Sequence, residues 1–412
     1  MGYFRRSFEG VSWMGLLRVG MRGLTFVRFF ILARLLSPAQ FGTYGVATLV
    51  LSFIEALTET GVNLILVQED KSLFDKYLNS AWIVSIGRGI LMFLIIFLAA
   101  PFISTFFHNP DSAAITRLIA FVPLIKGFIN PSLVLLQRDL HFKKEVIIRT
   151  SVSWIGGIAA IIAAVVLKSP ISLAIGMLVE AITEVAVTML FIAPRPKFQL
   201  NLLYLKHIFH RGKWLTMAGV FNYLFHQLDD IVVGRRLGDA ALGGYQMAYR
   251  IAILPITEVS DVFNRVTFPV YTAIGGDQGR LRKAFWKVVI AMTLFSIPFG
   301  VILSIFPTQL VKLFLGDQWL TITPLLSLLA VFGVLRAISG ACFPLFLAVK
   351  KQEYITVFTL FSIAGLLITI WPFVSWWGAY GAALSAMVGA VVALPYLSYR
   401  VWTVLYLPRS SA

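Results

Sequence analysis

Three arginines interrupt an apolar segment near the start of the chain. Residues 16–30 read LLRVGMRGLTFVRFF, and Arg18, Arg22 and Arg28 are their only charged residues. At about 100° per residue in a helix, Arg18 and Arg22 lie about 40° apart and Arg28 falls about 80° to the other side of Arg18. One broad face therefore holds all three. A guanidinium group keeps its charge and bonds phosphate oxygens in pairs, so this face is suited to a diphosphate.

Further ionisable residues lie in other apolar segments, where charges are costly and normally face protein or water. Lys126 lies within PLIKGFI, and Arg250 and Arg265 share one face of a predicted helix with two acids. We assign these three cations to the same anion-binding cavity. A second hypothesis is coupling to an ion gradient, and its candidate acids are Glu55, Glu59, Glu258 and Asp261. The alternative for all of these charges is pairing between helices that holds a bundle together.

The elements that must position these residues are transmembrane helices. The chain is 58% hydrophobic and 13% charged, with a mean hydropathy of +0.85, whereas a soluble domain carries about 25% charged residues. Apolar runs near the length that crosses a bilayer, about 20 residues, recur throughout. They predict an all-α polytopic membrane protein with about twelve transmembrane helices, at 11–35, 42–67, 79–106, 113–137, 146–167, 170–193, 213–237, 241–270, 285–307, 321–349, 354–374 and 380–406.

Basic residues are distributed unevenly between the links. With the N-terminus inside, 21 of the 35 Lys and Arg residues fall in segments on the inner side and 6 on the outer side. By the positive-inside rule both termini are cytoplasmic, which agrees with an even number of spans. The basic start, MGYFRRSFEG, has no cleavage site after a short apolar core, so we expect a cytoplasmic tail and not a removable signal.

An internal repeat divides the chain. At an offset of 201 residues, ARLLSPAQFGTYGVA (33–47) matches GRRLGDAALGGYQMA (234–248), with Arg34 opposite Arg235 and Tyr44 opposite Tyr245. We predict an N-lobe at 1–194, a cytoplasmic amphipathic linker at 195–212 and a C-lobe at 213–412. Two parallel six-helix repeats would form pseudo-symmetric lobes around a central cavity.

Several functions are disfavoured. The single cysteine, Cys342, excludes an internal disulfide and a cysteine metal cluster, and His207 and His210 have no acidic partner nearby, so no metal site is expected. The net charge is +16, but the sequence contains no block of basic residues that could bind nucleic acid, so a nucleic-acid-binding protein is not expected. The chain contains no G-x-x-x-x-G-K-[ST] motif, so ATP hydrolysis is not expected, and we predict that the protein is not an enzyme.

The segment LARLLSPAQFGTYGVATLVLSFIEALTETG (32–61) resembles the opening of the Wzx-type polysaccharide transporters of the MOP superfamily. The resemblance implies a flippase that moves an undecaprenyl-diphosphate-linked oligosaccharide from the inner to the outer leaflet of the bacterial cytoplasmic membrane. Transport would proceed by alternating access, for O-antigen or exopolysaccharide synthesis. Arg18, Arg22 and Arg28 match the family's first-span cations, and Arg250 matches the eighth-span position.

The same resemblance implies no cofactor beyond an H⁺ or Na⁺ gradient. The expected partners are the lipid-linked oligosaccharide, membrane lipids, and the polymerase and glycosyltransferases of the pathway. One alternative is a multidrug exporter of the same superfamily, whose cationic substrates would favour an anionic cavity. The other is a membrane glycosyltransferase or polysaccharide polymerase, which would need a sizeable outer loop carrying catalytic acids.

Overall fold

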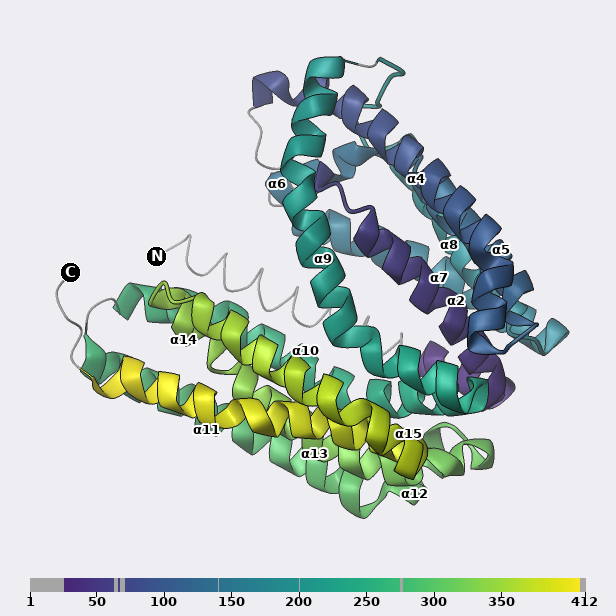
Figure 1. Ribbon diagram of the computed structural model, residues 1–412. Coiled ribbons are helices and arrows are strands. Elements are labelled where there is room, and N and C mark those ends of the chain that lie inside the picture. Colours follow the sequence, from purple (N-terminus) through teal and green to yellow (C-terminus); the bar gives the residue numbers. More distant parts are fainter. Residues whose placement is uncertain are drawn as a thin grey trace. The chain divides into compact units, whose positions relative to one another are not determined.

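The computed structural model describes residues 26–62, 66, 71–139, 141–199, 201–274 and 277–407. All regular secondary structure in these ranges is helical (Figure 1). Seven of the described helices are long and apolar enough to cross a membrane, and a pair bent by 73°, Ser112–Lys126 with Pro131–Arg138, brings the number up to eight. The predicted class, an all-α polytopic membrane protein, is confirmed.

A helix at residues 26–35 precedes the labelled elements. The labelled helices are α2 (Pro38–Leu57), α4 (Lys71–Phe107), α5 (Ser112–Lys126), η1 (Pro131–Val134), α6 (Leu135–Arg138), α7 (Phe142–Leu167), α8 (Ile171–Phe191), α9 (Leu202–Leu237), α10 (Asp239–Ile274), α11 (Gln278–Ile305), α12 (Pro307–Phe314), η2 (Asp317–Ile322), α13 (Thr323–Gly340), α14 (Phe343–Ala348) and α15 (Glu353–Tyr406). The predicted spans from 42–67 onward each overlap one of these helices or a helix pair. The last two share α15, which loses helical geometry only at Gly378. Most of the first predicted span lies outside the described residues.

The two copies of the repeat have a helix break at equivalent positions. Ser37 caps α2 with its side chain, since Gln40 N donates to Ser37 Oγ at 3.3 Å and Ser37 N donates to Gln40 Oε1 at 2.9 Å. In the second copy the break is at Gly238, whose φ of +81° is one that glycine adopts without strain. The following helices start at Pro38 and Asp239, which are 201 residues apart. The offset found in the sequence is therefore also the offset between these helix starts.

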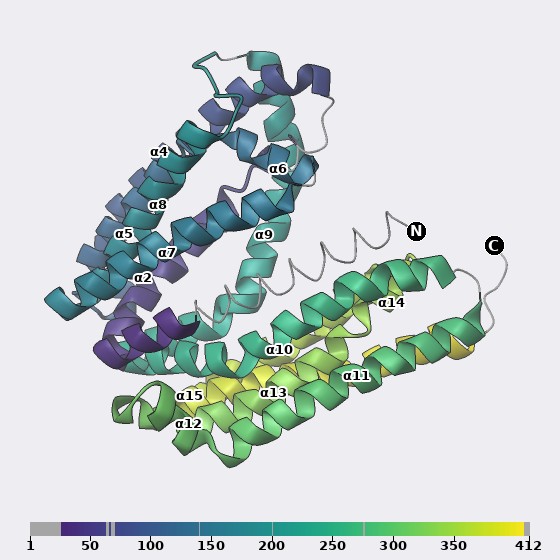
Figure 2. The same cartoon turned by 180° about the vertical axis from the view of Figure 1, so that it is seen from behind.

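The chain forms two compact units, residues 1–228 and 229–412. In the first, α2, α4, α5 and α8 share a core that includes the fully buried Ala47, Ile96, Ile119 and Ala174. In the second, α10, α11 and α14 pack around Tyr271, Phe285 and Phe346, beside α15. In both units many large apolar side chains point outward, as lipid-facing side chains do. Figure 2 shows α7 beside α8 in the first unit and α11, α13 and α15 side by side in the second.

The division between the units falls within α9. This helix runs without a break from Leu202 to Leu237, so most of the segment predicted as a linker is continuous with the seventh span. Its first part is attached to the first unit, because Thr216 Oγ1 donates to the Glu59 carbonyl at 2.6 Å and the Tyr223 hydroxyl donates to the Leu49 carbonyl at 2.9 Å. The predicted lobe boundaries stay a prediction; the observed division comes after Leu228.

Candidate functional site

Arg28 is the first-span arginine whose side chain the structure describes; Arg18 and Arg22 lie outside the described residues. The half-buried Arg28 reaches α7, where its Nη1 donates to the Ser153 carbonyl at 2.8 Å and approaches Ser153 Oγ at 3.4 Å. Gly157 lies one turn further along α7, and a Cβ added there would come within 2.2 Å of Arg28 Cδ. The absent side chain of Gly157 is therefore what lets Arg28 lie against α7.

Neutral groups bind Arg28 in the part of the chain that the structure describes. Among the residues that the structure describes, no carboxylate forms an ion pair with it, and its hydrogen bonds go to a neutral carbonyl and a hydroxyl. A guanidinium has five N–H donors, and Arg28 commits those on Nη1. No described hydrogen bond uses the remaining donors, and the anion-binding role of this residue stays a prediction.

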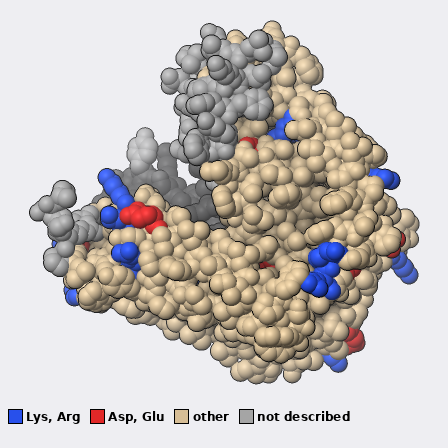
Figure 3. Space-filling view, in the orientation of Figure 1, with Lys and Arg blue, Asp and Glu red and all other residues tan. Residues whose placement is uncertain are grey.

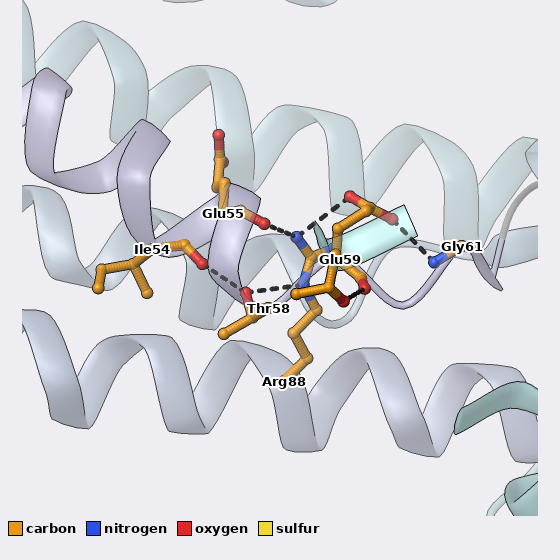
Figure 4. Close-up of polar contacts among 7 residues, drawn as sticks. Ile54, Glu55, Thr58, Glu59, Gly61 and Arg88 are labelled. Atoms are coloured by element: carbon orange, nitrogen blue, oxygen red, sulfur yellow. Dashed lines mark hydrogen bonds and ion pairs between the residues drawn. The ribbon is translucent and has the colours of Figure 1, made fainter. Parts of the chain in front are cut away.

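A second cationic group lies where α2 ends (Figure 4). Arg88, from α4, donates through Nε to Thr58 Oγ1 at 3.1 Å and through Nη2 to the Glu55 carbonyl at 2.9 Å. Nη2 also forms a 3.4 Å ion pair with Glu59 Oε2. The other Glu59 oxygen accepts from the Gly61 backbone N–H at 2.9 Å. This arrangement satisfies the end of α2, so Glu59 serves as a structural partner here.

Glu55 is placed differently from Glu59. Its carboxyl group points away from Arg88, while its backbone carbonyl accepts the Arg88 bond (Figure 4). Lys126, at the last residue of α5 before the bend, interacts electrostatically with the Glu55 carboxyl, as Arg88 does. The structure thus relates Lys126 to Glu55, two residues to which the sequence analysis gave different roles. Arg88 was missed as a site residue, although its position inside an apolar span was a usable signal.

The bend that follows Lys126 is held by Asn130. This side chain is fully buried and donates to the carbonyls of Ile192 at 3.0 Å and Pro194 at 3.2 Å, while its own oxygen accepts from Ser132 N. These bonds fix η1 and α6 to the end of α8. Lys126 is therefore held at a rigid break in the fourth span.

The second unit carries a buried polar cluster of opposite character. Asp229 is 6% exposed and accepts a 2.7 Å hydrogen bond from the fully buried Tyr245 hydroxyl. Asp230 beside it is hydrogen-bonded by Gln246 and interacts electrostatically with Arg250. Arg336 donates to the Tyr249 hydroxyl. The structure thus places Arg250, predicted as a substrate cation, beside an acid. The side chains of Arg265, Glu258 and Asp261 lie outside what the structure describes.

Charged side chains are sparse on the face drawn in Figure 3, where Lys and Arg form a few small groups on a largely uncharged surface. This distribution is expected where lipid is the solvent, because a charge exposed to hydrocarbon is costly.

The family model described as "Polysaccharide biosynthesis protein" matches residues 31–324. The chain belongs to this family. The resemblance to the Wzx-type polysaccharide transporters seen in residues 32–61 is thereby confirmed.

Two relatives of this family member illustrate the relationship. It is 27% identical to the lipopolysaccharide biosynthesis protein WzxC of Escherichia coli (strain K12), over 88% of this chain and 74% of that protein. It is 26% identical to the succinoglycan biosynthesis transport protein ExoT of Rhizobium meliloti (strain 1021), over 78% of this chain and 65% of that protein.

Solved structures share the fold of this polysaccharide biosynthesis protein. The lipid II flippase MurJ in an inward closed conformation matches with a TM-score of 0.74 at 17% identity, covering 94% of this chain and 87% of that one. An inward-facing multidrug resistance MATE transporter of the MOP superfamily matches with a TM-score of 0.70 at 16% identity, covering 94% and 95%. At these identities the likeness establishes the fold alone.

Proposed function

We propose that this protein is a flippase that moves a polyprenyl-diphosphate-linked oligosaccharide from the inner to the outer leaflet of the bacterial cytoplasmic membrane, by alternating access. The observation that carries the proposal is Arg28, a cation in an apolar span that no described carboxylate neutralises. Family membership and the transport role in the name of the relative ExoT support it. The protein itself would perform no covalent chemistry.

In this proposal the protein recognises its substrate through the diphosphate group. Arg28, together with Arg18 and Arg22, binds its oxygens, and Lys126, Arg250 and Arg265 stay as further candidate cations. The neutral partners of Arg28 leave its charge for the ligand, whereas Arg88 is committed to Glu59 and the end of α2. The proposed pathway partners are the polymerase and the glycosyltransferases of surface polysaccharide synthesis, and both termini would be cytoplasmic.

We extend the proposal to energy coupling through an H⁺ or Na⁺ gradient. Glu55 is the acid best suited to it, because its carboxyl points away from Arg88 and lies near Lys126, while Glu59 is ion-paired. Glu258 and Asp261 stay as further candidates. If this is right, Glu55→Gln should uncouple transport from the gradient while Glu59→Gln mainly weakens the end of α2.

The experiment that tests the function is complementation of a strain lacking this protein. Arg28→Ala should lose surface polysaccharide at an unchanged level of membrane-inserted protein, because the diphosphate loses a charged ligand. Arg28→Lys should rescue poorly, because an ammonium keeps the charge but cannot bond two oxygens side by side. Normal polysaccharide in Arg28→Ala cells would contradict the proposal.

The multidrug alternative makes the opposite prediction. A cavity that binds organic cations should not need arginines, so Arg28→Ala would leave the resistance of cells to cationic dyes unchanged or raise it. Loss of polysaccharide in that variant would favour the flippase, whereas normal polysaccharide with raised dye resistance would favour the exporter.

A further inference from the structure

Arg28 rests on α7 in a defined orientation. Its Nη1 donates to the carbonyl of Ser153, and its Cδ and Nη1 are the atoms nearest to the face of Gly157, within 2.2 and 2.8 Å of where a Cβ would stand. Ser153 and Gly157 are one turn apart and share a helix face. The contact spans 125 residues of sequence, so α7 contributes it through the fold alone.

This contact selects which edge of the guanidinium is free. Nη1 is the terminal nitrogen on the same side as Cδ, so the edge against α7 is the Cδ–Nη1 side. The opposite edge carries Nε–H and Nη2, two parallel donors that match the oxygens of one phosphate. No hydrogen bond among the described residues occupies that edge. Anchoring one edge also reduces the rotamer entropy that a ligand would have to remove.

We propose that Ser153 and Gly157 are positioning residues for Arg28: α7 holds the Nη1 edge so that the Nε–Nη2 edge is presented to one phosphate of the lipid diphosphate. The inference rests on the proposed function, and it adds a role for α7, the fifth span, in binding the diphosphate. Gly157 is required because any side chain would displace Arg28. Ser153 acts mainly through its backbone carbonyl, since its hydroxyl is 3.4 Å away.

The decisive variant is Gly157→Ala. The atoms that an added methyl group would meet belong to the flexible Arg28 side chain, so the protein is expected to fold normally with Arg28 displaced. The matched control is Gly156→Ala on the same helix. Its methyl group would meet the Gly176 carbonyl at 2.8 Å and Glu180 Cβ at 2.6 Å, so it should disturb the packing of α7 on α8. Ser153→Ala should behave nearly as the unsubstituted protein.

The measurement is the thermal stabilisation of the purified full-length protein by farnesyl diphosphate, with farnesol as the uncharged comparison. Arg28→Ala and Gly157→Ala should each weaken diphosphate binding about tenfold or more, the loss typical of a charge-assisted bond. The double variant should bind no more weakly than Arg28→Ala alone, because Gly157 acts only through Arg28. Gly156→Ala should lower the melting temperature, keep the diphosphate response and add to Arg28→Ala.

Three outcomes would overturn the inference: normal diphosphate binding by Gly157→Ala, a further loss in the double variant, or a melting temperature for Gly157→Ala as low as that of Gly156→Ala. If Arg28→Ala is impaired while Gly157→Ala is not, only the positioning role fails. If Arg28→Ala itself binds normally, the proposed anion site fails as well.

Discussion

Arg28 and Arg88 are both arginines in predicted spans, and the contacts of their guanidinium groups separate their roles. Arg88 donates to a hydroxyl, a carbonyl and a carboxylate that all lie at the end of α2. Cations near a helix C-terminus satisfy its last carbonyls in this way. Arg28 has no acidic partner among the described residues. Arg88 is therefore a structural arginine, and Arg28 is available to a ligand.

This difference predicts opposite consequences for substitution. Arg88→Ala should destabilise the protein by about 1–3 kcal/mol, because a partly buried charged donor is removed from three acceptors. Polysaccharide would then fall in proportion to the amount of folded protein, as measured by the level in membranes and the melting temperature. A stable Arg88→Ala protein that lacks transport would instead assign Arg88 to the substrate.

The sequence was sufficient to identify Arg28 but not its surroundings. An arginine in an apolar run can be recognised from the sequence alone, and helical spacing predicts the helix face on which it lies. Its partner Ser153 is 125 residues away, and nothing local to either residue encodes that contact. The same holds for Asp229, whose position beside Tyr245 depends on how α9 and α10 pack. Long-range pairing is what single-sequence reasoning lacks.

At the scale of elements, hydropathy predicted where helices cross the membrane, and it placed the break between the last two spans at residues 375–379, where Gly378 is the non-helical residue of α15. It did not predict the bend after Lys126, because 113–137 was predicted as one span. The apolar run continues through that bend, so composition alone does not mark it. α9 and α10 were predicted as spans despite several charges each, and both form long continuous helices.

The turn within α15 depends on two glycines. Gly378 adopts φ +59° and ψ −137°, a region essentially limited to glycine, and a Cβ on Gly381 would lie 1.9 Å from the Phe373 carbonyl. Gly378→Ala should therefore cost about 1–3 kcal/mol, and Gly381→Ala should be at least as damaging. Melting temperature in detergent measures both.

Gly340→Ala is the control for these substitutions, since no atom lies within 4 Å of the methyl group it would add. It should leave stability unchanged or raise it slightly, because alanine favours the helix. Equal losses for all three variants would show that the two turn glycines have no special role.

At the scale of the whole molecule, the two copies of the repeat share their backbone breaks but do not share charge at every position. The helix starts Pro38 and Asp239 are related by the offset of 201, and the same offset takes Arg28 to Asp229. One copy has a cation there and the other a buried acid bonded to Tyr245. The sequence comparison revealed the repeat, whereas this reversal became meaningful only when the contacts of both residues were known.

The orientation of the chain in the membrane leads to a labelling prediction. In a Cys342→Ala background, Asp317→Cys should react with a membrane-impermeant maleimide in intact cells, since its link is predicted to be outside and its side chain is 82% exposed. Lys351→Cys, at 51% exposure on the predicted inner side, should react only after permeabilisation. A permeant maleimide should label both. The reverse pattern would invert the topology.

The attachment of α9 has a consequence for the history of the chain. If the two halves arose by duplication, the ancestral copy ended before α9, yet the hydroxyls of Thr216 and Tyr223 now bond to carbonyls of α2 and the turn after it. The part of α9 up to Leu228 thus belongs to the first unit, although the sequence repeat assigns α9 to the second copy. A chain divided near residue 200 would therefore keep both hydrogen bonds only if its two fragments associate.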